Sequence, residues 1–200
     1  FFFYYCLCTS SERNPLGERA HFIKTLGRMA VFSALAVGMA SIMILPAYYS
    51  LTFGKTTFSN PNFSFAQKFD FLDLLSKMFP GSYDTVRPEG WPFVFSGTLT
   101  TILLPVFFMI RQITPRQKIA YGALMGFFVF SFNSTTIDLF WHGFQRPNWL
   151  NARFAYMFTA LMVLMAADVF INIKSIGAKA FTCSAVAWCA LLVILAKIGY

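Results

Sequence analysis

The chain has 200 residues, of which 57% are apolar and only 12% are charged. A soluble domain usually carries about 25% charged residues, so this composition excludes an intrinsically disordered chain and a disulfide-rich secreted scaffold and is typical of a membrane protein. The formal charge of +8 comes from short basic clusters between apolar runs, a pattern that indicates membrane anchoring rather than nucleic-acid binding.

Apolar runs of about 20 residues, the length that crosses roughly 30 Å of hydrocarbon as a helix, recur along the chain. Four complete runs lie at 29–51, 93–110, 119–140 and 154–173. A fifth lies at 180–198, and residues 1–8 resemble the end of a further membrane helix. The sequence therefore predicts an all-α, polytopic transmembrane helical bundle of about five spans plus a partial one. We expect residues 1–200 to be a single membrane-embedded segment of a larger protein.

Lysine and arginine gather in three alternate loops, which the positive-inside rule places in the cytoplasm. The connections between them, 52–92 and 141–153, are then expected on the extracytoplasmic side. The basic residues are Arg13, Arg19, Lys24 and Arg28 in the first loop, Arg111, Arg116 and Lys118 in the third, and Lys174 and Lys179 in the fifth.

The long outer loop carries a helical pattern between residues 65 and 79. Apolar side chains repeat there at the 3.6-residue period, while Asp70, Asp73 and Lys77 fall on the opposite side. Pro80-Gly81 is a helix stop. We predict a short amphipathic helix at 65–79 that lies in the outer interface. Asp70 and Asp73 are expected on its solvated face rather than as a pair of catalytic carboxylates.

The densest polar cluster lies at the end of the 119–140 run. If the helix continues past Trp141, then Asp138, His142 and Arg146 recur every four residues along one face, and Pro147 ends the helix near Arg146. Ionisable groups beside a bilayer are costly unless they are paired or hydrated, so such a cluster indicates a site. The candidate residues are Asp138, Trp141, His142, Gln145, Arg146, Asn148, Trp149 and Arg153.

Two interpretations of this cluster stay open. In the first, it binds an anionic and partly apolar ligand, such as a phosphate on a lipid tail. The two arginines would bind phosphate oxygens bidentately, the tryptophans would stack on a sugar, and Asn148 or Gln145 would bond its hydroxyls. In the second, the cluster is a headgroup-level belt that only anchors the spans. His142 is correspondingly either a general base or a structural residue.

Asp168 is an acidic residue inside the 154–173 run, within reach of Asn172 and Lys174. We expect it either to snorkel or to pair with such neighbours, or else to take a direct role. The four cysteines lie in apolar runs without metal-ligand spacing, so the sequence predicts no metal site and no cofactor.

The run Trp141–Arg153 resembles the W-x-G-F-x-x-P-N-x-x-x-x-R signature of the YfhO family of bacterial membrane proteins. The resemblance extends over roughly residues 1 to 173, and the signature loop is its most specific part. Other landmarks agree in order, namely Leu45-Pro46, Phe71-x-Asp73, Phe79-Pro80-Gly81-Ser82-Tyr83-Asp84 and Gly97.

This resemblance implies a C-type glycosyltransferase (GT-C) fold in a multi-pass protein of the bacterial cytoplasmic membrane. Studied relatives move a sugar from a polyprenyl-phosphate donor onto teichoic acid, such as lipoteichoic acid, so the implied partners are the lipid bilayer, that donor and an envelope polymer acceptor. The resemblance places the catalytic carboxylate in an outer loop upstream of Phe1. Arg146 and Arg153 would then stand beside the leaving phosphate.

Two other functions remain open at the level of the sequence. One is a transporter or flippase of a lipid-linked substrate, for which the polar cluster would line the path. The other is a non-catalytic membrane assembly subunit whose outer loop binds a partner.

Overall fold

The computed structural model describes residues 17–54, 66–81, 90–143 and 151–198. The chain divides into two compact units, residues 1–60 and 61–200. Regular structure in the described ranges is helical, which confirms the predicted all-α class. The apolar stub at 1–8 lies outside the described residues.

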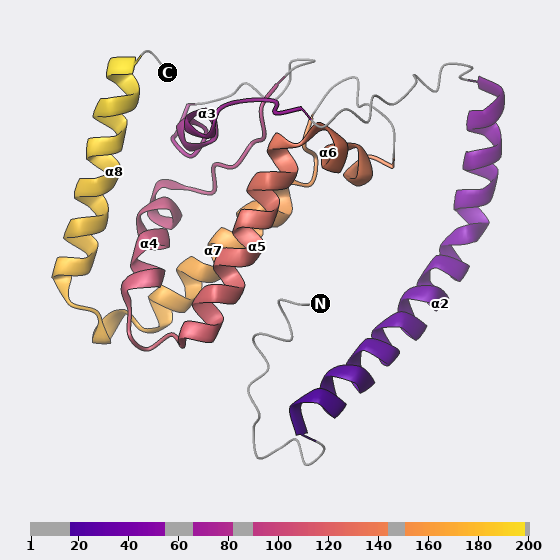
Figure 1. The fold of residues 1–200 in the computed structure, drawn as a ribbon, viewed down its shortest axis with the longest axis horizontal. Coiled ribbons are helices and arrows are strands. Elements are labelled where there is room, and N and C mark those ends of the chain that lie inside the picture. The colour runs from indigo at the N-terminus through magenta and orange to yellow at the C-terminus, as the bar shows by residue number, and fades with distance from the viewer. Residues whose placement is uncertain (1–16, 55–65, 82–89, 144–150, 199–200) are drawn as a thin grey trace. The chain divides into compact units, whose positions relative to one another are not determined.

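The first unit contains one long helix, α2 (Gly17–Gly54), drawn in indigo in Figure 1. Its stretch Ala20–Ser50 is long and apolar enough to cross a membrane, which supports the span predicted at 29–51. The helix is longer than the predicted span at its N-terminal end, because it begins among the basic residues. Lys24 and Arg28 are good helix formers, so the helix continues through them, and Pro46 lies inside it.

The second unit packs four helices side by side (Figure 1): α4 (Thr98–Met109), α5 (Pro115–Asn133), α7 (Ala155–Ile171) and α8 (Ala178–Ile198). Helix α7 contacts both α4 and α5, and α8 contacts α4. The Ser184 hydroxyl of α8 donates to the carbonyl oxygen of Ile102 at 2.5 Å. The largest fully buried side chains lie mainly on α4, α5 and α7 and include Phe107, Phe132, Met162, Met165 and Val169.

Only some of the described helices are long and apolar enough to cross a membrane. Helix α8 is long and apolar enough to span a bilayer, whereas α4 has 12 residues and α7 has 17. Twelve residues extend only about 18 Å as a helix, less than the roughly 30 Å of hydrocarbon. Two spans are therefore supported, and the bundle of about five spans stays a prediction.

Helix α4 begins later than the apolar run suggests. Residues 93–97, predicted as part of the span, are not helical. Gly97 has φ 104°, a conformation that favours glycine and lies outside the helical region, so the helix begins after it.

The predicted span at 119–140 is two helices. Helix α5 begins at Pro115, where Thr114 and Gln117 form a capping box. It ends at Asn133, and Ser134 has an extended backbone. The Ser134 hydroxyl then accepts from the amide of Ile137 and caps a new helix, α6 (Thr135–Trp141). A continuous apolar run thus contains a break that the hydropathy pattern does not reveal.

The outer-loop helix is shorter and oriented differently from the prediction. Helix α3 covers only Phe71–Ser76. Asp73 and Lys77 are buried, and Phe71 is 55% exposed, so the assignment of Asp73 to a solvated face was wrong. The Asp73 carboxylate accepts from the amide of Asp70 at 2.9 Å, and the Lys77 ammonium lies 4.9 Å from the ring centre of Trp91. In this short helix, Asp73 therefore caps the N-terminus and Lys77 packs against an aromatic ring, so neither side chain faces solvent. Asp70 is exposed, as expected.

Candidate functional site

The described residues at the start of the predicted polar cluster, Asp138, Trp141 and His142, lie at one end of the second unit, where α5 passes into α6 (Figure 1). Arg111 precedes α5, and Arg116 and Lys118 lie in its first turn, at the opposite end of that helix. Lys174 lies between α7 and α8, and Lys179 lies in the first turn of α8. The basic connections and the polar cluster are therefore separated by the length of the helices, which is the arrangement that the predicted orientation requires.

A short extended segment, residues 66–70, returns to this end; we call it the outer strap. Gln67 forms an antiparallel bridge with Ser134. The amide of Lys68 donates to the carbonyl oxygen of Asn133 at 3.0 Å, and the amide of Thr135 donates to the carbonyl oxygen of Ala66 at 3.2 Å. These bonds fasten the strap to the break between α5 and α6.

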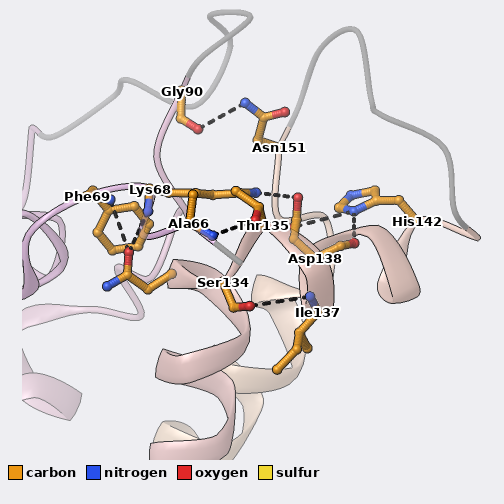
Figure 2. Close-up of polar contacts among 11 residues, drawn as sticks. Ala66, Lys68, Phe69, Gly90, Ser134, Thr135, Ile137, Asp138, His142 and Asn151 are labelled. Atoms are coloured by element: carbon orange, nitrogen blue, oxygen red, sulfur yellow. Dashed lines mark hydrogen bonds and ion pairs between the residues drawn. The ribbon is translucent and has the colours of Figure 1, made fainter. Parts of the chain in front are cut away.

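Side chains at the break strengthen the attachment. The Asn133 side-chain oxygen accepts from the amides of Lys68 and Phe69, both at 3.0 Å. The Thr135 hydroxyl accepts from the amide of Ala66 at 3.1 Å (Figure 2). The polar groups of Asn133 and Thr135 at the break between the two helices therefore form hydrogen bonds with the strap.

We expect replacement of Asn133 by alanine to loosen the strap. Two hydrogen bonds to one side-chain oxygen are lost, each contributing about 1 kcal/mol, so amide exchange in residues 66–70 should rise by up to about thirtyfold. Hydrogen–deuterium exchange of the full-length protein measures this. The matched control is Asn172→Ala, whose side chain donates to the carbonyl oxygen of Asp168. Unchanged exchange in the strap would contradict the role of Asn133.

The strap brings Lys68 to a carboxylate 70 residues further along the chain. Lys68 Nζ forms an ion pair with Asp138 Oδ2. On the other side of the carboxylate, His142 Nδ1 lies 3.4 Å from Asp138 Oδ1. Figure 2 shows Asp138 between the two cationic side chains. The side chains of Asp138 and His142 are only 6% and 7% exposed, and that of Lys68 is 29% exposed.

These contacts shift both titratable groups. Both residues belong to the α6 region, outside the two helices, α2 and α8, that are long and apolar enough to span a membrane. Burial acts to raise the pKa of the Asp138 carboxyl, but hydrogen bonds from His142 and Lys68, with their charges, outweigh it and lower that pKa. The hydrogen bond to the Asp138 side chain raises the pKa of His142 above its usual value, against the opposing effect of burial. Asp138 is thus held ionised, and protonated His142 is favoured.

Stacked aromatic rings from α5, α6 and the N-cap of α7 support the same cluster. Trp141 stacks on Phe154 at 4.8 Å with an interplanar angle of 16°, and Phe154 in turn stacks on Phe132 at 5.0 Å. The imidazole of His142 meets Phe154 at 6.1 Å. Trp141 remains 37% exposed. Trp141, which was predicted to face a ligand, is therefore also packed against the aromatic core.

The end of the signature loop is placed by an unusual turn. Asn151 donates from Nδ2 to the carbonyl oxygen of Gly90 at 3.4 Å. Ala152 is buried with φ 52°, a conformation that costs a non-glycine residue roughly 1 kcal/mol. Arg153 follows as an exposed residue, immediately before Phe154. This turn fixes the backbone position from which the Arg153 side chain projects.

The predicted site residues are therefore only partly placed. The structure brings together Asp138, Trp141 and His142, and Arg153 lies one residue from the ring that contacts the last two. Helix α6 ends at Trp141 and Gly143 has φ 63°, so the expected continuation of the helix to Arg146 was wrong. Four further predicted residues lie outside the described residues: Gln145, Arg146, Asn148 and Trp149.

Asp168 is paired, as one of its two interpretations proposed. Its carboxylate accepts a hydrogen bond from the hydroxyl of Tyr121 on α5, and its carbonyl oxygen accepts from Asn172 at 2.8 Å. The Tyr121 contact joins α5 to α7 near the basic end of the unit. It indicates a structural role for Asp168.

The family comparison agrees with the motif at residues 141–153. No curated protein and no solved structure matches the chain. The family model described as "Bacterial membrane protein YfhO" matches residues 1–200, so the match continues beyond residue 173, where the sequence resemblance was placed. The chain therefore belongs to the YfhO family of bacterial membrane proteins.

Proposed function

We propose that the full-length protein is a glycosyltransferase that moves a sugar from a polyprenyl-phosphate donor to a cell-envelope polymer such as teichoic acid, outside the cytoplasmic membrane. Membership of the YfhO family supports this reading. The observation that carries it here is the grouping of Asp138, Trp141 and His142 at the end of the bundle opposite the basic connections. An anionic lipid headgroup and a sugar meet a membrane protein at such an end.

The proposed reaction exchanges one bond at the anomeric carbon. An acceptor hydroxyl attacks that carbon, its bond to the donor phosphate oxygen breaks, and the lipid phosphate leaves with the electron pair. A carboxylate takes the hydroxyl proton. Asp138 is a poor base because two cations lower its pKa, and Asp73 is engaged in its helix cap. We therefore assign neither as the base.

The leaving phosphate needs positive charge and hydrogen-bond donors as its own negative charge develops. Arg153 and His142 are the described residues that we assign to this task, and Arg146 is a further candidate from the sequence. Trp141, 37% exposed, provides an aromatic surface for a sugar ring.

The direct test incubates the purified full-length protein with a labelled polyprenyl-phosphate sugar and the envelope polymer. Label on the polymer supports the transferase. In vesicles, label that changes leaflet without joining the polymer indicates a flippase instead. Neither event, with a folded protein, indicates a non-catalytic subunit.

Replacement of Arg153 by alanine should lower transfer per mole of folded protein by at least about tenfold, since a charged hydrogen bond to phosphate contributes about 1.5–3 kcal/mol. Arg153→Lys keeps the charge but not the bidentate geometry, so an intermediate rate is expected. Arg111→Ala, at the basic end, is the matched control and should leave transfer unchanged. Parallel loss of protein and activity in Arg153→Ala would point to folding and contradict the assignment.

A further inference from the structure

His142 has one ring nitrogen whose protonation is fixed by its neighbour. Nδ1 lies 2.8 Å from the backbone carbonyl oxygen of Asp138. A carbonyl oxygen only accepts, so Nδ1 carries a hydrogen in either charge state of the ring. The other nitrogen, Nε2, is then a bare acceptor in the neutral ring and an N–H donor in the protonated ring. The charge of the ring therefore decides what Nε2 can bind.

Nε2 is buried and, within the part of the chain that the structure describes, has no hydrogen-bond partner. The His142 side chain is 7% exposed. A buried polar atom without a partner costs about 1–3 kcal/mol, so it points to a contact that a ligand completes. Nδ1 already has its partners in Asp138, which leaves Nε2 as the free position on this ring.

The charges around His142 favour an anion. Asp138 faces it from α6, and Lys68 from the outer strap reaches the same carboxylate. The ring also meets Phe154, the N-cap residue of α7, with the exposed Arg153 one residue before it. One carboxylate between two cations gives these three side chains a net charge of +1 when His142 is protonated and zero when it is neutral. Arg153 adds a further positive charge at the same end.

We propose that Nε2 of His142 donates a hydrogen bond to an oxygen of a phosphate group, while Asp138 orients the ring and favours its protonated form and Lys68 holds the Asp138 carboxylate in place. The ligand chemistry is an oxyanion, either the phosphodiester of a lipid or a free anion. Its identity as the donor phosphodiester rests on the function proposed above. Asp138 and Lys68 are positioning residues, because they act on the ligand through His142.

This geometry makes anion binding depend on pH. Below the pKa of His142 the ring is charged and Nε2–H donates to the anion. Above it the ring is neutral and the Nε2 lone pair repels an oxyanion. The Asp138 contact raises the pKa of His142, which extends binding from acidic conditions towards neutral pH. Binding should weaken as pH rises, with a midpoint above 6.5, the usual pKa of histidine.

The test measures dissociation constants with the full-length protein in maltoside micelles, which contain no phosphate, between about pH 5.5 and about pH 8.5. One probe is dihexanoyl phosphatidylglycerol, a phosphodiester whose charge is constant in this range; the other is sulfate, a free oxyanion. The affinity of the wild-type protein for at least one of the two probes should fall about tenfold from the lowest to the highest pH of this range. His142→Gln, which keeps a neutral amide donor, should show no pH dependence.

Lys68→Met tests the positioning role. The Lys68 charge acts to lower the pKa of His142, so its removal should move the midpoint of binding to higher pH. A residue that only supported folding would not move this midpoint. Lys179→Met, an exposed residue at the basic end of the unit, is the matched control and should leave it unchanged.

The outcomes separate the site from the reaction. Binding that is independent of pH, that strengthens with pH, or that keeps its pH dependence in His142→Gln would overturn the proposal. A midpoint unmoved in Lys68→Met would overturn the role of Lys68. Preference for the lipid probe identifies a lipid phosphodiester as the ligand, and preference for sulfate identifies a free oxyanion. If pH-dependent binding occurs without sugar transfer, the anion site is supported and the glycosyltransferase proposal fails. If sugar transfer occurs without pH-dependent binding, the glycosyltransferase proposal is supported and the anion site at His142 fails.

Discussion

Replacement of Asp138 by asparagine is expected to destabilise the full-length protein by roughly 3 kcal/mol, because it leaves two cations close together without their counter-ion. The Asp138 and His142 side chains are at least nine-tenths buried, so water does not replace the lost charge there. The estimate is at the low end of the range for a broken buried pair because Lys68 is 29% exposed and can turn towards solvent. Thermal unfolding in micelles, followed by tryptophan fluorescence, measures the loss.

The same variant has a pH signature. The pKa of Asp138 is lowered, so its stabilisation is present above 3.8, the usual carboxyl value, and is lost as pH falls through the lowered pKa. The pKa of His142 is raised, so its stabilisation is complete below 6.5 and is lost as pH rises through the raised pKa. Both contributions are present between these two values.

The wild-type contribution of this cluster should therefore be largest between pH 3.8 and pH 6.5, and the difference in melting temperature between wild type and Asp138→Asn should be greatest there. Asp70→Asn is the matched control, because Asp70 is exposed and asparagine is an equally good helix N-cap. A constant difference across the pH range would show that Asp138 acts through packing alone.

Replacement of Phe132 by alanine is the second large effect, with an expected loss of about 3–5 kcal/mol. Phe132 is 1% exposed, stacks on Phe154 and meets Phe158 edge-on at 5.7 Å. Its removal leaves a cavity beneath the ring on which Trp141 stacks. The same unfolding measurement reports it.

Phe170→Ala is the control for that variant, since Phe170 is 60% exposed on α7 and its removal leaves no internal cavity. A loss below about 1 kcal/mol is expected there. Equal losses in the two variants would mean that the stacked rings do not form the core at this end.

The sequence predicts a helix well when the helix coincides with a long apolar run. The apolar stretches of α2 and α8 lie close to the predicted spans, because a run of about 20 apolar residues has few alternatives to a membrane helix. It predicts helix ends less well. Gly97 and Ser134 interrupt apolar runs through backbone conformation and capping, which hydropathy does not register.

The candidate site divides in the same way. Asp138 and His142 are four residues apart, so helical periodicity places them on one face even though α6 ends at Trp141. Asn133 and Lys68 were not among the candidate residues, and no local pattern joins them. Lys68 lies in the loop 52–92, which is predicted to be extracytoplasmic and whose charges balance. The hint in the sequence was the group of polar side chains at the end of the 119–140 run.

Local composition and spacing thus determined that this is a helical chain of a membrane protein family, with its polar signature and its basic connections at opposite ends. The tertiary structure alone decided that the outer strap closes on the break after α5, that Asp73 is buried while Phe71 is exposed, and that Lys68 completes the environment of His142. Contacts between residues 70 positions apart depend on how whole helices pack, and that packing is not encoded in any single stretch of the sequence.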